Sequence, residues 1–139
     1  MEIVSGDNLG RIFIWWTETG EILRQCFVHK GPIKSMQFDS IHIVSGGTDK
    51  CVCITDIATG EVIQTLRGHE KHVLAIAFDY ERIISVSADN TLRYAIISNS
   101  EYLRIFRFLP TLLYSFTLTY SLDTGNGVRR PPLKIKFMC

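Results

Sequence analysis

The chain has 139 residues, and 46% of them are hydrophobic, which is enough for one domain with an apolar core. Its formal net charge of +1 provides no strong field for nucleic acid or an anionic membrane, so neither is expected as a partner. The N-terminus shows no secretory signal, and Cys26, Cys51, Cys53 and Cys139 follow neither a disulfide nor a zinc spacing. We therefore expect reduced thiols and a cytoplasmic or nuclear location.

Short β-branched or alternating runs, separated by turns rich in Gly, Asp and Asn, predict an all-β chain as far as residue 107. The first unit, residues 1–27, has three expected strands, and the units 33–67 and 73–107 have four each. In chain order the expected strands span residues 2–6, 12–15, 22–27, 33–38, 41–45, 51–55, 62–66, 73–78, 82–86, 91–96 and 101–106.

These units are copies of one another, offset by 40 residues, as Gly20 with Gly60 and His29 with His69 illustrate. Aligning residues 3–39 with residues 43–79 gives eleven identical pairs, at Ile3, Val4, Ser5, Gly6, Ile14, Thr19, Gly20, Glu21, His29, Phe38 and Asp39. The third copy is more divergent. A period near 40 residues with strand-like patterning is typical of a β-propeller, in which each blade has four antiparallel strands.

The repeat ends after Arg107, and residues 108–139 form a divergent tail that looks irregular. The stretch 108–122 carries no charge, but it is short for a membrane span and contains Pro110. A membrane or targeting element is therefore the less favoured interpretation of this stretch, and no membrane partner is expected.

Within the tail, polar and apolar residues alternate from Tyr114 to Leu122, which favours one extra strand within residues 113–122. The 40-residue offset matches Leu113–Leu118 with Val73–Phe78. Such a strand either covers the outer flank of the third unit or fills the vacant strand of the first. The first arrangement is favoured, because the second requires the chain to bend around three units, and a poorly folded tail is the alternative.

Several motifs recur in register: Gly68-His69, then Ser85, then the turn Asp89-Asn90-Thr91, with Thr59-Gly60-Glu61 in the middle copy. Together they resemble the WD-repeat family of β-propellers over about residues 1–107. The resemblance implies a partial, non-closed propeller with a partial blade at 1–27, blades at 33–67 and 73–107, and the tail after them. Closed propellers have at least about four blades, so missing blades or a partner is expected to cover the open ends.

Blades of this family often hold a polar network formed by the His of Gly-His, a Ser on the second strand, an Asp in the following turn and a Trp on the third strand. The resemblance implies two such networks, formed by His29, Ser45 and Asp49 and by His69, Ser85 and Asp89. The Trp position holds Thr55 and Ala95 in these copies. The first copy keeps Ser5 and Trp15 but has Leu9 at the Asp position and no upstream His. A partly buried His and Asp are tolerated only when they bond to each other, so each pair is expected to join a loop to a turn.

Three chemical alternatives compete with this structural interpretation. A Ser/His/Asp set also suits nucleophilic catalysis, but its recurrence in two units favours a structural role. The pair His69 and His72 lacks the further ligands of a metal site. The pair Trp15-Trp16 lacks the basic stripe of a platform on which bases stack. Because phosphate loops and nucleophile elbows are also absent from the sequence, we expect no enzyme, no metal and no cofactor.

The resemblance implies a non-catalytic scaffold that binds other proteins, here as a truncated or partial form. The alternative is the substrate-recognition fragment of an F-box-type ubiquitin-ligase adaptor. In this family the Gly-His loop and the Asp turn lie on one face, and loops on a rigid scaffold commonly carry recognition residues. The candidate partner-binding residues on that face have mixed charges, which suit a protein or peptide, although solvated turns are the simpler interpretation: Lys30, Lys50, Glu70, Lys71, His72 and Asn90.

Overall fold

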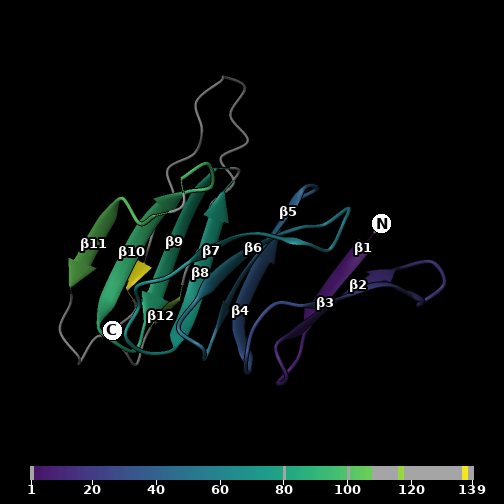
Figure 1. The fold of residues 1–139 in the computed structure, drawn as a ribbon, viewed down its shortest axis with the longest axis horizontal. Helices are drawn as coiled ribbons and strands as arrows, with labels where there is room; N and C mark the ends of the chain where they lie inside the picture. The colour runs from purple at the N-terminus through teal and green to yellow at the C-terminus, as the bar shows by residue number, and fades with distance from the viewer. Residues whose placement is uncertain (1, 80, 100, 108–115, 118–135, 138–139) are drawn as a thin grey trace.

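The computed structural model describes residues 2–79, 81–99 and 101–107, together with the backbone of residues 116–117 and 136–137. These residues form strands and turns, and no helix occurs among them (Figure 1). No helix in the described part of the chain is long and apolar enough to cross a membrane. The strands are β1 (Glu2–Gly6), β2 (Arg11–Trp16), β3 (Ile22–Phe27), β4 (Ile33–Phe38), β5 (His42–Gly47), β6 (Val52–Asp56), β7 (Val62–Leu66), β8 (Val73–Asp79), β9 (Arg82–Ser87), β10 (Thr91–Ile96), β11 (Arg104–Arg107), β12 (Phe116–Thr117) and β13 (Lys136–Phe137).

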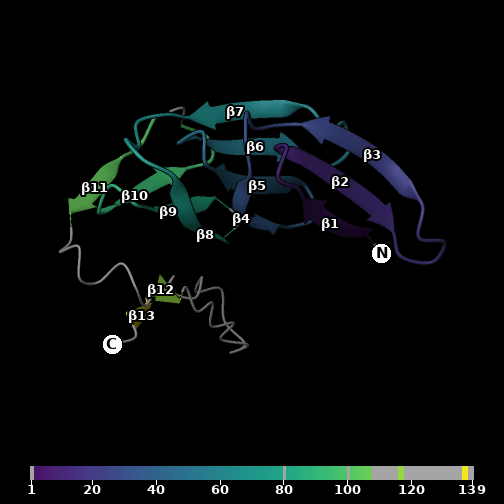
Figure 2. The ribbon, with the colours of Figure 1, turned by 90° about the horizontal axis from the view of Figure 1, so that it is seen from below.

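The strands pair only with antiparallel neighbours in three successive sheets. Sheet one has the order β1-β2-β3, sheet two β4-β5-β6-β7 and sheet three β8-β9-β10-β11, while β12 pairs with β13. The three sheets follow one another in an open arc, with β1, β4 and β8 on its inner side and β3, β7 and β11 on its outer side (Figure 2). The fold is therefore all-β and does not close into a ring, as the sequence predicted.

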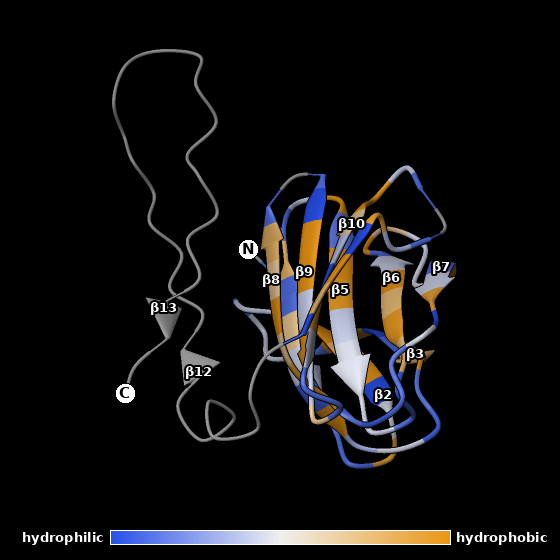
Figure 3. Cartoon of the chain, turned by 90° about the vertical axis from the view of Figure 1, so that its left-hand side faces the viewer, coloured by the Kyte–Doolittle hydropathy of each residue, from blue (hydrophilic) through white to orange (hydrophobic). Residues whose placement is uncertain are grey.

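The sheets pack face to face through apolar strand residues (Figure 3), and β5 of the middle sheet supplies them on both faces, with Ile43 in one cluster and Val44 in the other. One cluster joins sheets one and two and contains Val4, Ile12, Ile14, Cys26, Ile43 and Ile57. A larger cluster joins sheets two and three and contains Val44, Val52, Ile54, Leu66, Val73, Ile76, Phe78, Ile83 and Ala95. The apolar face of one sheet is thus covered by the next sheet in the arc.

Polar side chains on β4 fix the position of β8 in the neighbouring sheet. The backbone N–H of Ile76 donates to the Ser35 hydroxyl oxygen at 3.0 Å, and the backbone N–H of Phe78 donates to the Gln37 side-chain oxygen at 2.8 Å. These bonds join residues 41 positions apart in the chain, so they tie two sheets together. Each of the two amide groups has a defined partner between the sheets.

The final strand of sheet three differs from the sequence prediction. A strand was expected at residues 101–106, but β11 begins at Arg104 and ends at Arg107. The register is nevertheless that of sheet two, since Leu92 opposes Phe106 as Val52 opposes Leu66. The difference arises before β11, where the side chain of Tyr102 packs against His69. Of the extra strand expected within residues 113–122, only Phe116–Thr117 belongs to the described residues; the remainder lies outside them.

Gly46 marks a position where sheets two and three approach closely. A Cβ atom there would lie 2.5 Å from Val73 Cγ1 and 2.9 Å from Ile76 Cδ1. We predict that Gly46→Ala lowers the free energy of unfolding by about 1–3 kcal/mol, because the branched side chains opposite must move. Chemical denaturation measures this change. The matched variant Gly6→Ala should cost less, since its Cβ would meet Ile33 Cδ1 at 3.0 Å; equal losses would contradict the prediction.

Candidate functional site

The polar network of sheet three joins a loop, a strand and a turn. His69 lies in the loop between β7 and β8, and its Nδ1 is 3.0 Å from Asp89 Oδ2 in the turn between β9 and β10. Its Nε2 is 2.8 Å from the hydroxyl oxygen of Ser85 on β9. An ionised carboxylate only accepts, so Nδ1–H donates to Asp89 and Nε2 accepts from Ser85 in the neutral imidazole. Asp89 also accepts from the backbone N–H of Glu70 at 2.8 Å.

An equivalent network occurs in sheet two. His29 Nδ1 is 2.9 Å from Asp49 Oδ1, and His29 Nε2 is 2.9 Å from the Ser45 hydroxyl oxygen. The backbone N–H of Lys30 donates to Asp49 Oδ2 at 3.1 Å, as Glu70 does to Asp89. The structure therefore brings all six sequence-predicted network residues together as two sets of three. Both imidazole rings are fully buried, and each has a partner at both nitrogens.

The fourth position of each network is filled differently. The indole N–H of Trp15 donates to Ser5 at 2.8 Å in sheet one. In sheet two the buried Thr55 hydroxyl has no hydrogen-bond partner among the described residues. In sheet three Tyr102 replaces the missing aromatic group, with its hydroxyl 3.2 Å from that of Ser85 and its ring edge-on to His69 at 5.5 Å.

Sequence reasoning did not identify Tyr102 or Thr91 as members of the network. The Thr91 hydroxyl lies 3.1 Å from His69 Nδ1 and donates to Asp89 Oδ1. Tyr102 precedes β11 by two residues, and no motif in the sequence indicates that its ring packs against His69. Thr91 sits two residues after Asp89, and that short spacing is the one signal that links it to the turn.

Burial sets the protonation of the network in sheet three. Burial lowers the pKa of His69 because it disfavours the imidazolium, and this outweighs the opposite effect of Asp89. Burial raises the pKa of Asp89, but hydrogen bonds from Thr91, Glu70 and His69 outweigh it and lower the pKa to about 2. A neutral imidazole beside an ionised carboxylate is thus the stable form at neutral pH.

This geometry has the distances of a nucleophilic triad, but its serines are inaccessible. Ser45 and Ser85 are both 0% exposed, so a substrate carbonyl has no path to either hydroxyl oxygen. The thiol of Cys53 next to His29 is also buried, and burial raises its pKa to about 12, which leaves little thiolate at neutral pH. The described residues contain no group of three His, Cys, Asp or Glu side chains arranged to hold a metal ion.

The loops and turns that the networks join lie on one face of the array, here called the loop face. Two backbone bonds fix them further: Thr48 N–H donates to Pro32 O, and Ala88 N–H donates to His72 O, both at 3.0 Å. Five of the six candidate partner-binding residues are exposed there, namely Lys30, Lys50, Glu70, Lys71 and His72, whereas Asn90 is half-buried. Lys50 and Asn90 have positive φ angles of 69° and 62°, which fix the direction of their side chains at a strain cost for Lys50.

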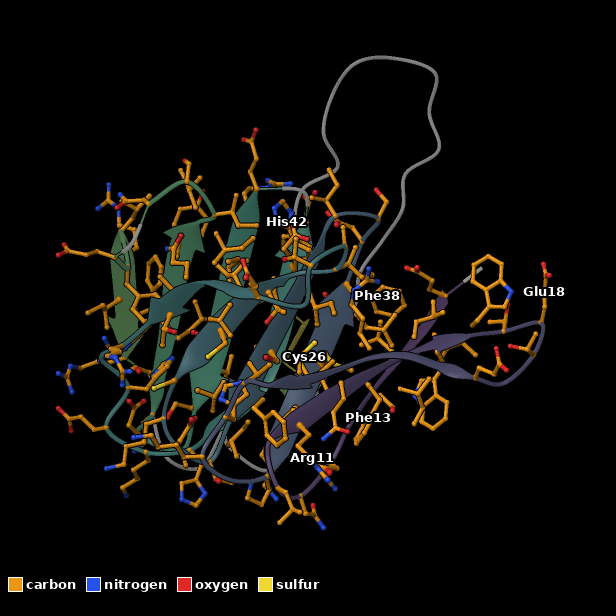
Figure 4. The ribbon with its side chains drawn as sticks, turned by 45° about the vertical axis from the view of Figure 1, so that its right-hand side comes forward. Arg11, Phe13, Glu18, Cys26, Phe38 and His42 are labelled. Atoms are coloured by element: carbon orange, nitrogen blue, oxygen red, sulfur yellow. The ribbon has the colours of Figure 1, made fainter. Side chains whose placement is uncertain are left out.

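Other polar groups lie away from these networks. Arg11 bonds Asp7 at 2.7 Å and lies over the ring of Phe13 at 5.3 Å, at one end of sheet one (Figure 4). His42, the first residue of β5 in sheet two, lies on the opposite side of the array from Arg11 in Figure 4 and places its ring edge-on to Phe78 at 6.4 Å. His42 Nδ1 also lies 3.9 Å from Asp39 Oδ1, and we do not assign a chemical site to either group.

We predict that Asp89→Ala lowers the free energy of unfolding by about 1–3 kcal/mol, because it leaves the buried Nδ1–H of His69 and the amide of Glu70 without their acceptor. Urea denaturation followed by circular dichroism measures the change. Asp49→Ala removes the corresponding acceptor in sheet two and should have a similar effect. The exposed variant Glu18→Ala should leave stability within about 0.5 kcal/mol of the wild type, and a comparable loss there would contradict the assignment.

Acid should destabilise the fold through the same network. The pKa of His69 is lower in the folded chain than its ordinary value of 6.5, so its contribution is complete above that pH and is lost as the pH falls below it. Asp89 adds a second loss as the pH falls from 3.8 towards about 2. Thermal melts across this range should show the decline in stability. His69→Gln should flatten the decline below pH 6.5, whereas His72→Gln, at an exposed position, should not.

Comparison with known proteins gives the same architecture. The family model described as "WD domain, G-beta repeat" matches residues 20–56 and 60–94, which is more than half of the chain. The computationally designed Ika8 protein superposes on 76% of this chain with a TM-score of 0.72 and 32% identity, over 33% of its own length. The computationally designed Ika4 protein superposes on 78% of this chain with a TM-score of 0.74 and 31% identity, over 68% of its own length.

The chain thus spans about a third of the length of Ika8, and both designed proteins are β-propellers. No curated protein sequence matches the chain significantly. The first match contains His29, Ser45 and Asp49, and the second contains His69, Ser85 and Asp89, so each matched repeat includes one complete network. The chain belongs to the WD40-repeat family of β-propeller proteins.

Proposed function

We propose that this chain is a non-catalytic recognition module whose loop face binds a protein or peptide. WD40 repeats indicate a scaffold of the protein-interaction type, and the finer assignment to one face is our own. The observation that carries it is that two hydrogen bonds hold each loop to the neighbouring turn. A buried His and a backbone amide from the same loop bond the carboxylate of the neighbouring turn, so the exposed side chains between them have defined positions.

The charges on the loop face suit a partner of mixed polarity. Lys30, Lys50 and Lys71 are exposed beside Glu70, and His72 lies next to them in sequence. A nucleic-acid backbone would favour an uninterrupted positive stripe, which these residues do not form. The positive φ of Lys50 adds support, because a long charged side chain occupies a position where glycine would be less strained.

The buried serines support the non-catalytic part of the proposal. A hydroxyl that is 0% exposed and hydrogen-bonded within the fold stabilises that fold and does not contact a substrate. The narrower role of an F-box-type adaptor is supported by no contact among the described residues and stays a prediction from the sequence.

Charge reversal tests the loop face. We predict that Lys50→Glu with Lys71→Glu abolishes capture of specific partner proteins in an affinity pull-down. Each change replaces a positive side chain that the proposed partner contacts with a negative one. Arg24→Glu with Arg104→Glu is the matched control, since both residues are exposed on the outer strands and the change in charge is equal. Circular dichroism should show an intact fold in both. If the control loses the same partners and the loop-face variant retains them, the binding surface is the outer rim.

A further inference from the structure

Positive charges gather on the loop face. In its loops and turns and at the end of β11, five basic side chains are exposed beside one carboxylate, that of Glu70. The basic residues are Lys30, Lys50, Arg67, Lys71 and Arg107. Three further carboxylates lie on this face, but Asp49 and Asp89 are held in the networks and Asp7 is paired with Arg11. The charge that the loop face presents to a partner is therefore positive.

The opposite face, formed by the turns at the other ends of the strands, is negative. The exposed charged residues of these turns are all glutamates: Glu18, which Figure 4 labels, Glu21, Glu61, Glu81 and Glu101. Three of them recur with the 40-residue repeat, so each sheet contributes a carboxylate at the same place. The described turns of this face expose no Lys or Arg, since Arg82 is half-buried and bonds Asp79. A net charge of +1 is thus distributed over two faces of opposite sign.

Three of the basic residues lie around the start of β6. Arg67 Nη1 is 3.4 Å from the Sγ of Cys51, and Lys50 immediately precedes this cysteine. Burial and the charge of Asp49 raise the pKa of the Cys51 thiol, while the charges of Arg67 and Lys30 lower it, so both cations lie close to the same sulfur. No ion pair joins these three cations to a carboxylate in the described part of the chain.

A fourth cation lies beside the same loop. Arg93 on β10 is half-buried, with its guanidinium 5.3 Å from the centre of the Tyr102 ring and its Nε 3.4 Å from the Thr91 hydroxyl. Gly68 permits this position, because a Cβ atom there would lie 2.5 Å from Arg93 Nη1. Arg93 forms no ion pair with any described residue. A guanidinium held in one orientation is suited to bind a carboxylate through two N–H groups.

We propose that the partner segment recognised by the loop face is an acidic peptide, whose carboxylates contact Lys30, Lys50 and Arg67. Arg93 pairs with one further carboxylate at the edge of this cluster. The inference rests on the function proposed above and names the chemical class of its partner. The negative charge of the opposite face repels such a peptide, so the peptide binds on one face only. Glu70 interrupts the positive surface, so the partner places an uncharged or basic residue opposite it.

Two other occupants fit this surface less well. A nucleic-acid strand carries a phosphate at every step and would meet the carboxylate of Glu70. A second copy would place its glutamates on the loop face, but that head-to-tail contact leaves the same two faces open at the ends of the stack and does not close. An acidic peptide needs carboxylates only where the cations lie.

Fluorescence anisotropy on the full chain tests the proposal with a labelled peptide in which Asp alternates with Gly. This peptide should bind more weakly as salt increases, and the same peptide with Asn in place of Asp should not bind. Lys50→Gln with Arg67→Gln should weaken binding by at least about fivefold, because exposed ion pairs each contribute modestly. Arg24→Gln with Arg104→Gln removes the same charge from exposed positions on the outer strands and should change binding by less than about twofold.

Four results would overturn the acidic partner. Equal losses in the two Gln pairs would show that binding follows net charge, and equal binding of the Asp and Asn peptides would show that carboxylates are not recognised. A labelled single-stranded oligonucleotide that binds more tightly than the Asp peptide, and through Lys50 and Arg67, would assign the face to nucleic acid. A mass in light scattering that rises with concentration, and that Lys50→Gln with Arg67→Gln returns to the monomer, would assign it to a second copy.

Competition separates this proposal from the function on which it rests. In the affinity pull-down, the Asp peptide should displace the partner proteins captured by the wild-type chain, and the Asn peptide should not. Partners that require Lys50 and Lys71 but resist the Asp peptide would leave the loop face as the binding surface and overturn the acidic class. Partners retained by Lys50→Glu with Lys71→Glu would overturn the proposed function, and the acidic partner with it.

Discussion

Face-to-face packing between neighbouring sheets is the constraint on which the rest of this structure depends. Each sheet is thin and apolar on its buried faces, so no sheet here is stable without a neighbour. Ile12 and Ile14 of sheet one, and Val44 and Val52 of sheet two, are fully buried only because the next sheet covers them. Gly46 shows how close this approach is, since even one methyl group there would collide with Val73 and Ile76.

This packing leaves the loops at the ends of the strands as the place where polar groups must be satisfied. The His/Ser/Asp networks do so by joining three pieces of backbone through one imidazole ring. Each carboxylate also accepts from the loop that carries its His, so the loop cannot move without breaking two charge-assisted bonds. A buried, neutral His beside an ionised Asp makes the loop face rigid, which is what recognition by side chains on loops requires.

Sheet three shows how such a network tolerates the loss of one member. Ala95 occupies the position at which the family often has Trp, and Tyr102 reaches the same Ser85 hydroxyl from a different part of the chain. Burial among these groups raises the pKa of Tyr102 to about 12, so its hydroxyl stays protonated and available as a donor. Sheet two has no such replacement, and its Thr55 hydroxyl lacks a hydrogen-bond partner in the described part of the chain.

The sequence by itself determined the strands of the three sheets and the pairing of His29 with Asp49 and His69 with Asp89, because a 40-residue period and turn chemistry are local and repeat in register. It did not determine the start of β11 or the role of Tyr102, which depend on a ring turning inward to a residue 33 positions earlier. It also did not reveal that Ser35 and Gln37 bond the backbone of β8. Contacts between sheets join residues that are far apart in the sequence, and no local sequence pattern indicates them. Only the tertiary structure decided them.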